Sequence, residues 1–295
     1  MLELEKLDKR YGDVVALRSM TWTATRGRLV GFLGPNGAGK TTSMRSVFGL
    51  VDLDGGAVRW DEEPVGPWAW SRFGYMPEQR GLYPRMAVGE QITYFAELHG
   101  MERAEAHDAA TALLDELGLG DRAGDALRDL SHGNQQRVQL AVALVHEPDC
   151  LILDEPFSGL DPIGVEAMTA TLRERAARGG AVVFSSHQLD LVESLCDDVV
   201  VVHDGAVVLD GPLDRVRRTA PHRRVEVELA GGATWEPPPG ATDVERRSGR
   251  LRFLVDEDAD AAALLASARA ADEVAHFSFS APSLSEIFRA AVVGP

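Results

Sequence analysis

The sequence predicts an α/β fold with a mixed β-sheet core, an antiparallel β lip and an α-helical subdomain, followed by a small α+β domain. Three short apolar runs favour this fold, because each is typical of a buried strand that ends in polar residues. They are Leu29–Leu33 before a glycine loop, Cys150–Leu153 before two acids, and Ala181–Ser185 before Ser186 and His187. The carboxyl ends of parallel strands meet at one edge of a sheet, so the runs predict a common site there.

Composition indicates an ordinary globular protein. The 295 residues are 45% hydrophobic and 26% charged, which is enough for one large core and a small second domain. The net charge of −16 repels polyanions, so no nucleic-acid partner is expected. Residues 1–12 carry charges where a signal peptide needs an apolar run, and no window is as long as a membrane span. We therefore expect a cytoplasmic protein whose cysteines, Cys150 and Cys196, are core residues.

The elements follow in a clear order along the first domain, residues 1–218. Stretches up to about Val65 alternate between strand-like and turn-like, which suits an antiparallel lip beside a parallel core. Residues of about 88–147 have apolar positions at three- and four-residue spacing, which predicts the helical subdomain. Strand, helix and strand patterns come next, and then a hairpin over 199–211 with Asp204 and Gly205 as its turn.

A second domain is predicted over residues 219–295. Its segments 223–229, 249–255 and 275–280 read as strands, and 259–275 reads as a helix. Ser283 is a candidate cap for a last helix over 283–293. No residue of this domain has a catalytic arrangement, so we expect a role in dimer contact or regulation.

The segment GPNGAGKTT, residues 34–42, matches the phosphate-binding pattern G-x-x-x-x-G-K-[ST] in the required context of a strand before and a helix after. Its glycines let successive amides face phosphate oxygens, and Thr41 can ligate Mg²⁺. Lys40 is one of only three lysines among thirty basic residues, and a plain glycine turn would not explain it. The predicted nucleotide-binding set is Gly34, Pro35, Asn36, Gly37, Ala38, Gly39, Lys40, Thr41 and Thr42.

Two later strand ends supply the remaining chemistry. Asp154 can hold Mg²⁺ at the end of its strand, while Glu155 faces the γ-phosphate as a general base. His187 ends a parallel strand on the ligand side and is a candidate contact to the γ-phosphate. A bound nucleotide with a γ-phosphate and Mg²⁺ are therefore expected, and the family resemblance described below implies that the nucleotide is ATP.

Another anion site is suggested at residues 131–134. Ser131 can cap a helix, which leaves the amides of His132, Gly133 and Asn134 at the positive end of the helix dipole. Taken alone, this segment could be a capped helix and nothing more.

The ordered set of motifs resembles the ATP-binding subunit of ABC transporters, a P-loop NTPase family, across roughly the first 220 positions. LSHGNQQR resembles the family signature LSGGQ followed by QQR, and SGLD at 158–161 resembles the D-loop. His187 matches the switch histidine, and Tyr11 matches the aromatic residue that stacks on adenine. The resemblance implies a head-to-tail dimer with a second copy, in which Ser131, Gly133 and Asn134 act in trans.

This sequence departs from the family pattern at two places. His132 and Asn134 replace glycine and glutamine of the signature, but the Ser131 hydroxyl and the backbone amides remain. Glu78 stands where most relatives have the Q-loop glutamine, and its carboxylate can still ligate Mg²⁺. Gln79, its neighbour, is the alternative for this role.

The resemblance implies an ATP-hydrolysing subunit that powers export through a separate transmembrane permease, peripheral on the inner face of the membrane. The run EQRGLYP and the C-terminal PSLSEIF resemble exporter ATPases, while an importer ATPase and a soluble ABC ATPase remain alternatives. A single cassette without a long heptad run disfavours the soluble class, and Glu155 disfavours a role in binding alone. Candidate residues for docking the permease, or for minor core, are Trp68, Trp70, Leu82, Tyr83, Pro84 and Met86.

Overall fold

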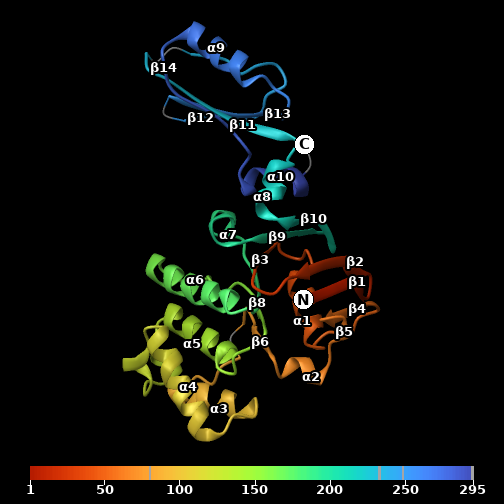
Figure 1. Cartoon of the computed structure of the whole chain (residues 1–295), viewed down its shortest axis with the longest axis vertical. Coiled ribbons are helices and arrows are strands. Elements are labelled where there is room, and N and C mark those ends of the chain that lie inside the picture. The colour runs from red at the N-terminus through yellow and green to blue at the C-terminus, as the bar shows by residue number, and fades with distance from the viewer. Residues whose placement is uncertain (80, 232–233, 248, 294–295) are drawn as a thin grey trace. The chain divides into compact units, whose positions relative to one another are not determined.

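The computed structural model describes residues 1–79, 81–231, 234–247 and 249–293. By its internal contacts the chain divides into two compact units, Met1–Gly211 and Pro212–Pro295. The elements of each unit are labelled in Figure 1.

A six-stranded sheet forms the centre of the first unit, in the order β10-β9-β3-β8-β7-β6. Its strands are β3 (Leu29–Leu33), β6 (Phe73–Met76), β7 (Cys150–Leu153), β8 (Ala181–Ser185), β9 (Asp198–His203) and β10 (Ala206–Pro212). The pairs β6/β7, β7/β8, β8/β3 and β3/β9 are parallel. Every residue of β3, β7 and β8 is buried, so the three apolar runs lie side by side in the core as predicted.

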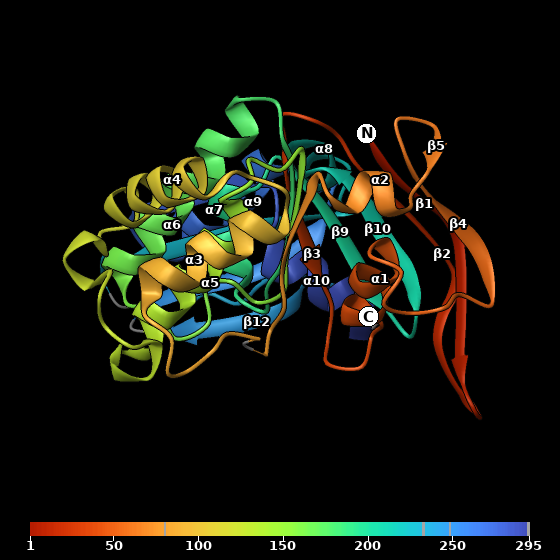
Figure 2. The same ribbon diagram turned by 90° about the horizontal axis from the view of Figure 1, so that it is seen from below.

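The antiparallel lip is a second sheet in the order β2-β1-β4-β5. It consists of β1 (Leu2–Tyr11), β2 (Val14–Ala24), β4 (Gly55–Trp60) and β5 (Glu63–Pro64). Trp22 and Trp60 from the lip share one apolar cluster with Phe32 and Phe73 from the central sheet. Burial of these aromatic side chains stabilises the packing of the lip against the sheet. Figure 2 shows β1, β2 and β4 of the lip beside the central strands.

Helices complete the first unit. Those beside the sheets are α1 (Lys40–Val47), α2 (Pro67–Trp70), α6 (Pro162–Ala177) and α7 (Leu189–Leu195). The helical subdomain contains α3 (Val88–Leu98), α4 (Arg103–Glu116) and α5 (His132–Leu144), with short 3₁₀ turns between α4 and α5. The predicted α/β fold with a mixed sheet, a lip and a helical subdomain is confirmed.

The hairpin between β9 and β10 turns at Asp204 and Gly205, as the sequence predicted. Their φ angles are 45° and 78°, so both residues are left-handed. This is the backbone of a tight primed turn, which matches the twist of the two strands.

The second unit is an α+β structure whose sheet has the order β12-β13-β11-β14. It contains α8 (Leu213–Arg218), β11 (His222–Leu229), β12 (Thr242–Arg247), β13 (Arg250–Asp256), α9 (Ala261–Ala271), β14 (Val274–Ser280) and α10 (Leu284–Val293). Its core gathers Val225, Val227 and Phe253 from the sheet with Leu264 of α9. The sequence analysis missed β12, because TDVERR is exposed throughout and lacks the alternation of a half-buried strand.

Ser283 caps α10 as expected. Its hydroxyl accepts a hydrogen bond from the Glu286 amide at 3.3 Å, and Glu286 Oε2 accepts from the Ser283 amide at 2.6 Å. These reciprocal bonds form a capping box, which satisfies two free amides at the start of the helix.

Candidate functional site

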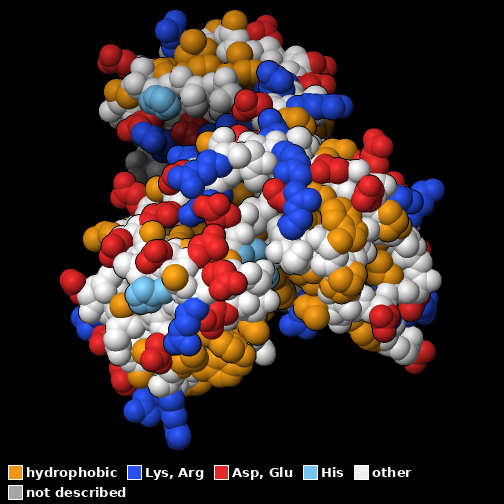
Figure 3. All heavy atoms as spheres, turned by 60° about the horizontal axis from the view of Figure 1, so that its bottom comes forward, with side chains coloured by type: hydrophobic (Ala, Val, Ile, Leu, Met, Phe, Trp, Pro, Cys, Tyr) orange, Lys and Arg blue, Asp and Glu red, His pale blue; other side chains and the backbone are white. Residues whose placement is uncertain are grey.

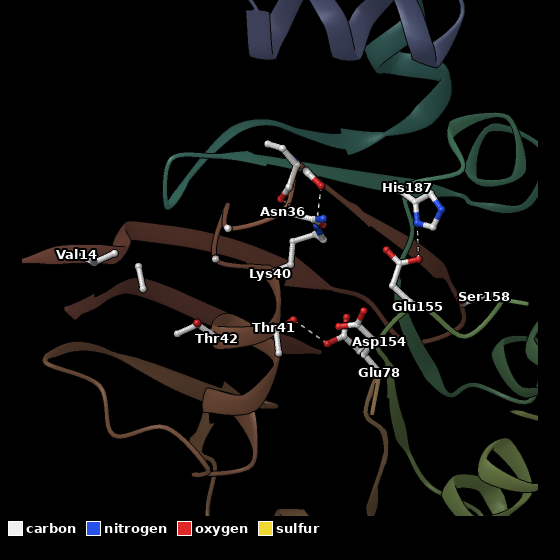
Figure 4. A pocket seen from close by; sticks show the side chains of 15 residues that line it. Val14, Asn36, Lys40, Thr41, Thr42, Glu78, Asp154, Glu155, Ser158 and His187 are labelled. Carbon is white, nitrogen blue, oxygen red and sulfur yellow. Dashed lines mark hydrogen bonds and ion pairs between the residues drawn. The ribbon is translucent and has the colours of Figure 1, made fainter. Parts of the chain in front are cut away.

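A cavity of about 780 Å³ opens at the carboxyl ends of β3 and β7. It brings together side chains from both predicted motifs (Figure 4). The residues that line it are Val14, Ala16, Gly34, Pro35, Asn36, Gly37, Gly39, Lys40, Thr41, Thr42, Glu78, Asp154, Glu155, Ser158 and His187.

The loop before α1 needs glycine at two positions for steric reasons. Gly39 has φ 97°, and a Cβ there would lie 2.5 Å from the Ala16 carbonyl oxygen. A Cβ on Gly34 would lie 2.4 Å from the Val202 carbonyl oxygen. The loop therefore packs against the lip and against β9 with no room for a side chain at these two positions.

Lys40 is the buried cation of this site, with only 8% of its surface exposed. Its Nζ donates to the carbonyl oxygens of Gly34 at 2.6 Å and Pro35 at 3.1 Å. Burial lowers the pKa of Lys40, while the nearby Glu155, Asp154 and Glu78 carboxylates raise it in part. The ammonium is thus anchored by its own loop at the place where phosphate oxygens would enter.

Asp154 is held by two hydroxyl groups. Thr41 Oγ1 donates to Asp154 Oδ2 at 2.8 Å, and Ser185 Oγ donates to Oδ1 at 2.7 Å. A hydroxyl and a carboxylate are the hard oxygen ligands that suit Mg²⁺, which also takes phosphate oxygens and water. Of the two Q-loop neighbours, Glu78 lines the cavity and Gln79 does not.

Ser185 is a site residue that the sequence analysis missed. It is fully buried, and its Oγ also accepts a hydrogen bond from the Glu155 amide at 2.8 Å. One hydroxyl therefore fixes both acids at the end of β7. The only sequence signal was a polar residue ending a strand of four apolar residues.

Glu155 and His187 are paired within the cavity. His187 Nδ1 lies 2.9 Å from Glu155 Oε2, and the side chains are 69% and 16% exposed, respectively. Glu155 has φ 52°, an unusual backbone for this residue. Gln136 of α5 braces the turn, since its Nε2 donates to the carbonyl oxygens of Glu155 at 3.2 Å and Pro156 at 3.0 Å.

The predicted second anion site is at the start of α5. Ser131 Oγ accepts a hydrogen bond from the Asn134 amide at 3.3 Å, so the predicted cap is present. Ser131 is exposed, and Ser131, Gly133 and Asn134 do not line the cavity of their own chain. His132 packs over the D-loop, where a Cβ on Gly159 would lie 2.5 Å from its Nδ1. The start of α5 therefore packs against the D-loop through His132, while Ser131 is exposed.

Tyr11 lies outside the cavity lining, at the end of β1, and is 51% exposed. Lys9 Nζ lies 5.3 Å from the centre of its ring. Val14 and Ala16 of β2, across the turn from Tyr11, do line the cavity. The lip therefore contributes Val14 and Ala16 to the cavity, and Tyr11 stays a predicted contact.

The candidate docking residues separate into two groups. Trp70 is half-buried and donates from Nε1 to the Val47 carbonyl oxygen at 2.9 Å, which marks it as core. Trp68 and Tyr83 are 41% and 49% exposed, and Tyr83 stacks on Phe95 with ring centres 6.2 Å apart. Arg80 of the EQRGLYP run lies outside the described residues. Apolar side chains gather in patches among charged ones on the face shown in Figure 3.

The fold and the cavity define a P-loop nucleotide-binding cassette. Comparisons with known protein families support this assignment. Residues 17–158 match the family model of the ABC transporter, and residues 211–292 match that of the ATP-binding protein DrrA1-3-like, C-terminal domain.

An uncharacterised ABC transporter ATP-binding protein of Bacillus subtilis is 37% identical over 227 residues, covering 77% of this chain and 76% of the relative. A Nod factor export ATP-binding protein of Burkholderia lata is 35% identical, covering 77% of this chain and 73% of the relative. A solved ATP-binding subunit of an ABC transporter superposes with a TM-score of 0.69 at 33% identity, over 74% of this chain and 92% of that one.

The chain belongs to the ATP-binding proteins of the ABC transporters. It is an ATP-binding subunit of the ABC ATPase class, a class that generally hydrolyses ATP, forms dimers and works with transmembrane partners. None of the helices in the described residues is long and apolar enough to span a bilayer.

Proposed function

We propose that residues 1–218 hydrolyse ATP to drive export through a separate transmembrane permease, and that the subunit lies on the inner face of the membrane through that permease. The observation that carries the proposal is the cavity in which Lys40, the Thr41–Asp154 pair and the Glu155–His187 pair converge. Phosphoryl transfer to water needs a phosphate cradle, metal ligands and a base, and this cavity supplies all three.

Within this proposal each side chain has a separate task. Lys40 neutralises charge on the β- and γ-phosphates, and Thr41, Asp154 and Glu78 hold Mg²⁺ directly or through water. The metal, when bound, neutralises the charge that develops on the transferred group. Glu155 accepts a proton from the attacking water, while His187 holds the Glu155 carboxylate and contacts the γ-phosphate.

The signature residues act on a second copy of the chain in this scheme. Ser131, Gly133 and Asn134 do not line the cavity of their own chain, so the Ser131 hydroxyl and the backbone at the start of α5 can contact a γ-phosphate bound by another subunit. ATP bound between two chains stabilises their association, and hydrolysis removes that stabilisation.

Export, rather than import, is favoured by one similarity. A relative that is 35% identical is named for Nod factor export. Trp68 and Tyr83 are exposed aromatic residues from separate segments, and aromatic residues are enriched at protein interfaces. We propose both as contacts for the permease.

Two measurements test the proposal in sequence. The purified chain should hydrolyse ATP in the presence of Mg²⁺, and Lys40→Ala should abolish turnover. Inside-out vesicles that contain the permease should then accumulate cargo only with ATP and the unaltered chain. ATP hydrolysis without accumulation of cargo in the vesicles would contradict export. Equal accumulation of cargo with the Lys40→Ala chain would contradict the proposal that this ATPase site drives transport.

A further inference from the structure

The two edges of the second unit's sheet differ in their protection. The edge strand β12 carries Asp243, Glu245, Arg246 and Arg247, and charged side chains of this kind oppose pairing with another chain. The opposite edge strand, β14, has the sequence VAHFSFS, without Asp, Glu, Lys or Arg. One edge is therefore guarded by charge and the other is not.

The uncharged edge strand, β14, is also paired regularly with its neighbour β11. β14 pairs with β11 from His276↔Glu228 to Ser280↔Arg224 without a register shift between them. Among the described residues, β11 is the only strand that pairs with β14. Alternate amide and carbonyl groups along residues 276–280 hence point away from the sheet, as a template for one more antiparallel strand. Figure 1 shows β14 with α9 in the same unit.

The apolar face of β14 is incompletely covered. Phe277 and Phe279 lie opposite Val227 and Val225 of β11 and pack against the core cluster of this unit. Both phenylalanines are only half-buried, because they stand at the margin of the sheet. A neighbouring strand with apolar residues on the same face would bury the rest of both rings.

We propose that β14 pairs antiparallel with β14 of a second copy, about a two-fold axis through Ser278, so that the two sheets become continuous. This register places Phe277 of each chain beside Phe279 of the other, and His276 beside Ser280. Aromatic residues in directly opposed positions stabilise antiparallel strands. No charged side chain falls in the paired segment.

Other symmetric registers of two β14 strands give fewer aromatic pairs or fewer backbone donors. An axis through Phe277 would oppose Ala275 to Phe279 and leave one aromatic pair instead of two. An axis through Phe279 would oppose Pro282, which lacks an amide hydrogen, to His276. A second copy is the partner that we favour, because a two-fold symmetric interface uses the same surface of both chains. Ser278 would lie on the axis and face Ser278 of the second copy.

The contact is small, since one pair of short strands buries less than a stable interface needs. Pairing is therefore weak and depends on the protein concentration, and any second contact between the two chains would strengthen it by raising their effective concentration. The pairing does not rest on the proposed ATP-driven dimer.

Disulfide trapping in the full chain tests the pairing and its register. Ser278→Cys would bring two Cα atoms to about 5 Å, within the range of a disulfide. Ser280→Cys, on the same strand and face, would leave its two Cα atoms roughly 14 Å apart. Val244→Cys is the matched control on β12. Burial raises the pKa of the Cys150 thiol to about 12, and it also raises the pKa of the Cys196 thiol, so the native thiols react slowly.

Under mild oxidation without nucleotide, Ser278→Cys should form covalent dimers at least about tenfold faster than either control, because pairing concentrates its thiols. Equal rates for all three variants, or a faster Ser280→Cys, would overturn the proposal. Adding Lys40→Ala should leave the Ser278→Cys rate unchanged, since the pairing does not need ATP. A cross-link that disappears with Lys40→Ala would assign the contact to the cassettes and would also overturn it.

Discussion

Replacing Glu155 by Gln isolates the chemical step. The substitution keeps the shape of the side chain, and the backbone anchors of this residue remain: its amide donates to Ser185 Oγ at 2.8 Å, and its carbonyl accepts from Gln136 at 3.2 Å. Only the proton acceptor is lost. Positioned general bases contribute about 10² to 10⁴ in rate, which corresponds to about 3 to 5.5 kcal/mol of the barrier.

ATP affinity should survive this substitution or increase. Burial lowers the pKa of Lys40, and among the carboxylates that raise this pKa again Glu155 has the largest effect. The Glu155 carboxylate would also repel a bound γ-phosphate, and the amide of the variant would remove that repulsion. Steady-state phosphate release and equilibrium binding of ATP with Mg²⁺ would measure the two effects. Glu166→Gln, the same change on the exposed surface of α6, is the matched control. Turnover within about threefold of the unaltered chain would refute the general-base assignment.

Three further predictions follow from contacts around the cassette. Ser185→Ala should cost about 1 to 3 kcal/mol in the free energy of unfolding, measured with urea, because the Glu155 amide and Asp154 Oδ1 lose their buried partner; an unchanged midpoint would contradict this. Gly159→Ala should lower turnover, since its Cβ would lie 2.5 Å from His132 Nδ1 and displace the signature, and His132→Ala should restore part of the rate in the double variant; additive losses would contradict the coupling. His146 stacks on His99 with ring centres 3.6 Å apart, and its Nε2 donates to the Phe73 carbonyl oxygen at 3.0 Å. Burial lowers the pKa of His146 to about 4. The unfolded chain therefore takes up this proton first, so stability is complete above about pH 6.5 and falls as the pH drops towards 4. Between pH 7.5 and 5.5 the chain should lose about 1.4 kcal/mol more than His146→Gln, and equal losses would refute the assignment.

The strands and the phosphate loop were predictable because their causes are local. The apolar runs before Gly34, Asp154 and Ser186 each have the length and composition of a buried strand. The phosphate loop contains Gly39 because its backbone adopts a conformation there that other residues rarely adopt. These features can be read in windows of a few residues.

The braces of the site were not predictable, because they join distant positions. Gln136 and Gln139 read as polar positions of an amphipathic helix, yet both are buried, and Gln139 Nε2 donates to the Pro77 carbonyl oxygen at 2.5 Å. Together they tie α5 to the Q-loop and to the Glu155 turn. Trp70 likewise read as a loop residue, and only the packing around α1 shows that it belongs to the core.

In the proposed dimer, each ATP is held by the P-loop of one chain and the signature of another. Mixing two inactive variants, Lys40→Ala and Ser131→Arg, tests it most directly. In a mixed pair, the intact P-loop of one chain meets the intact signature of the other. Random pairing should then restore about a quarter of the unaltered ATPase rate, since half of the pairs are mixed and each has one intact site of two. A mixture no more active than the separate variants would contradict the account.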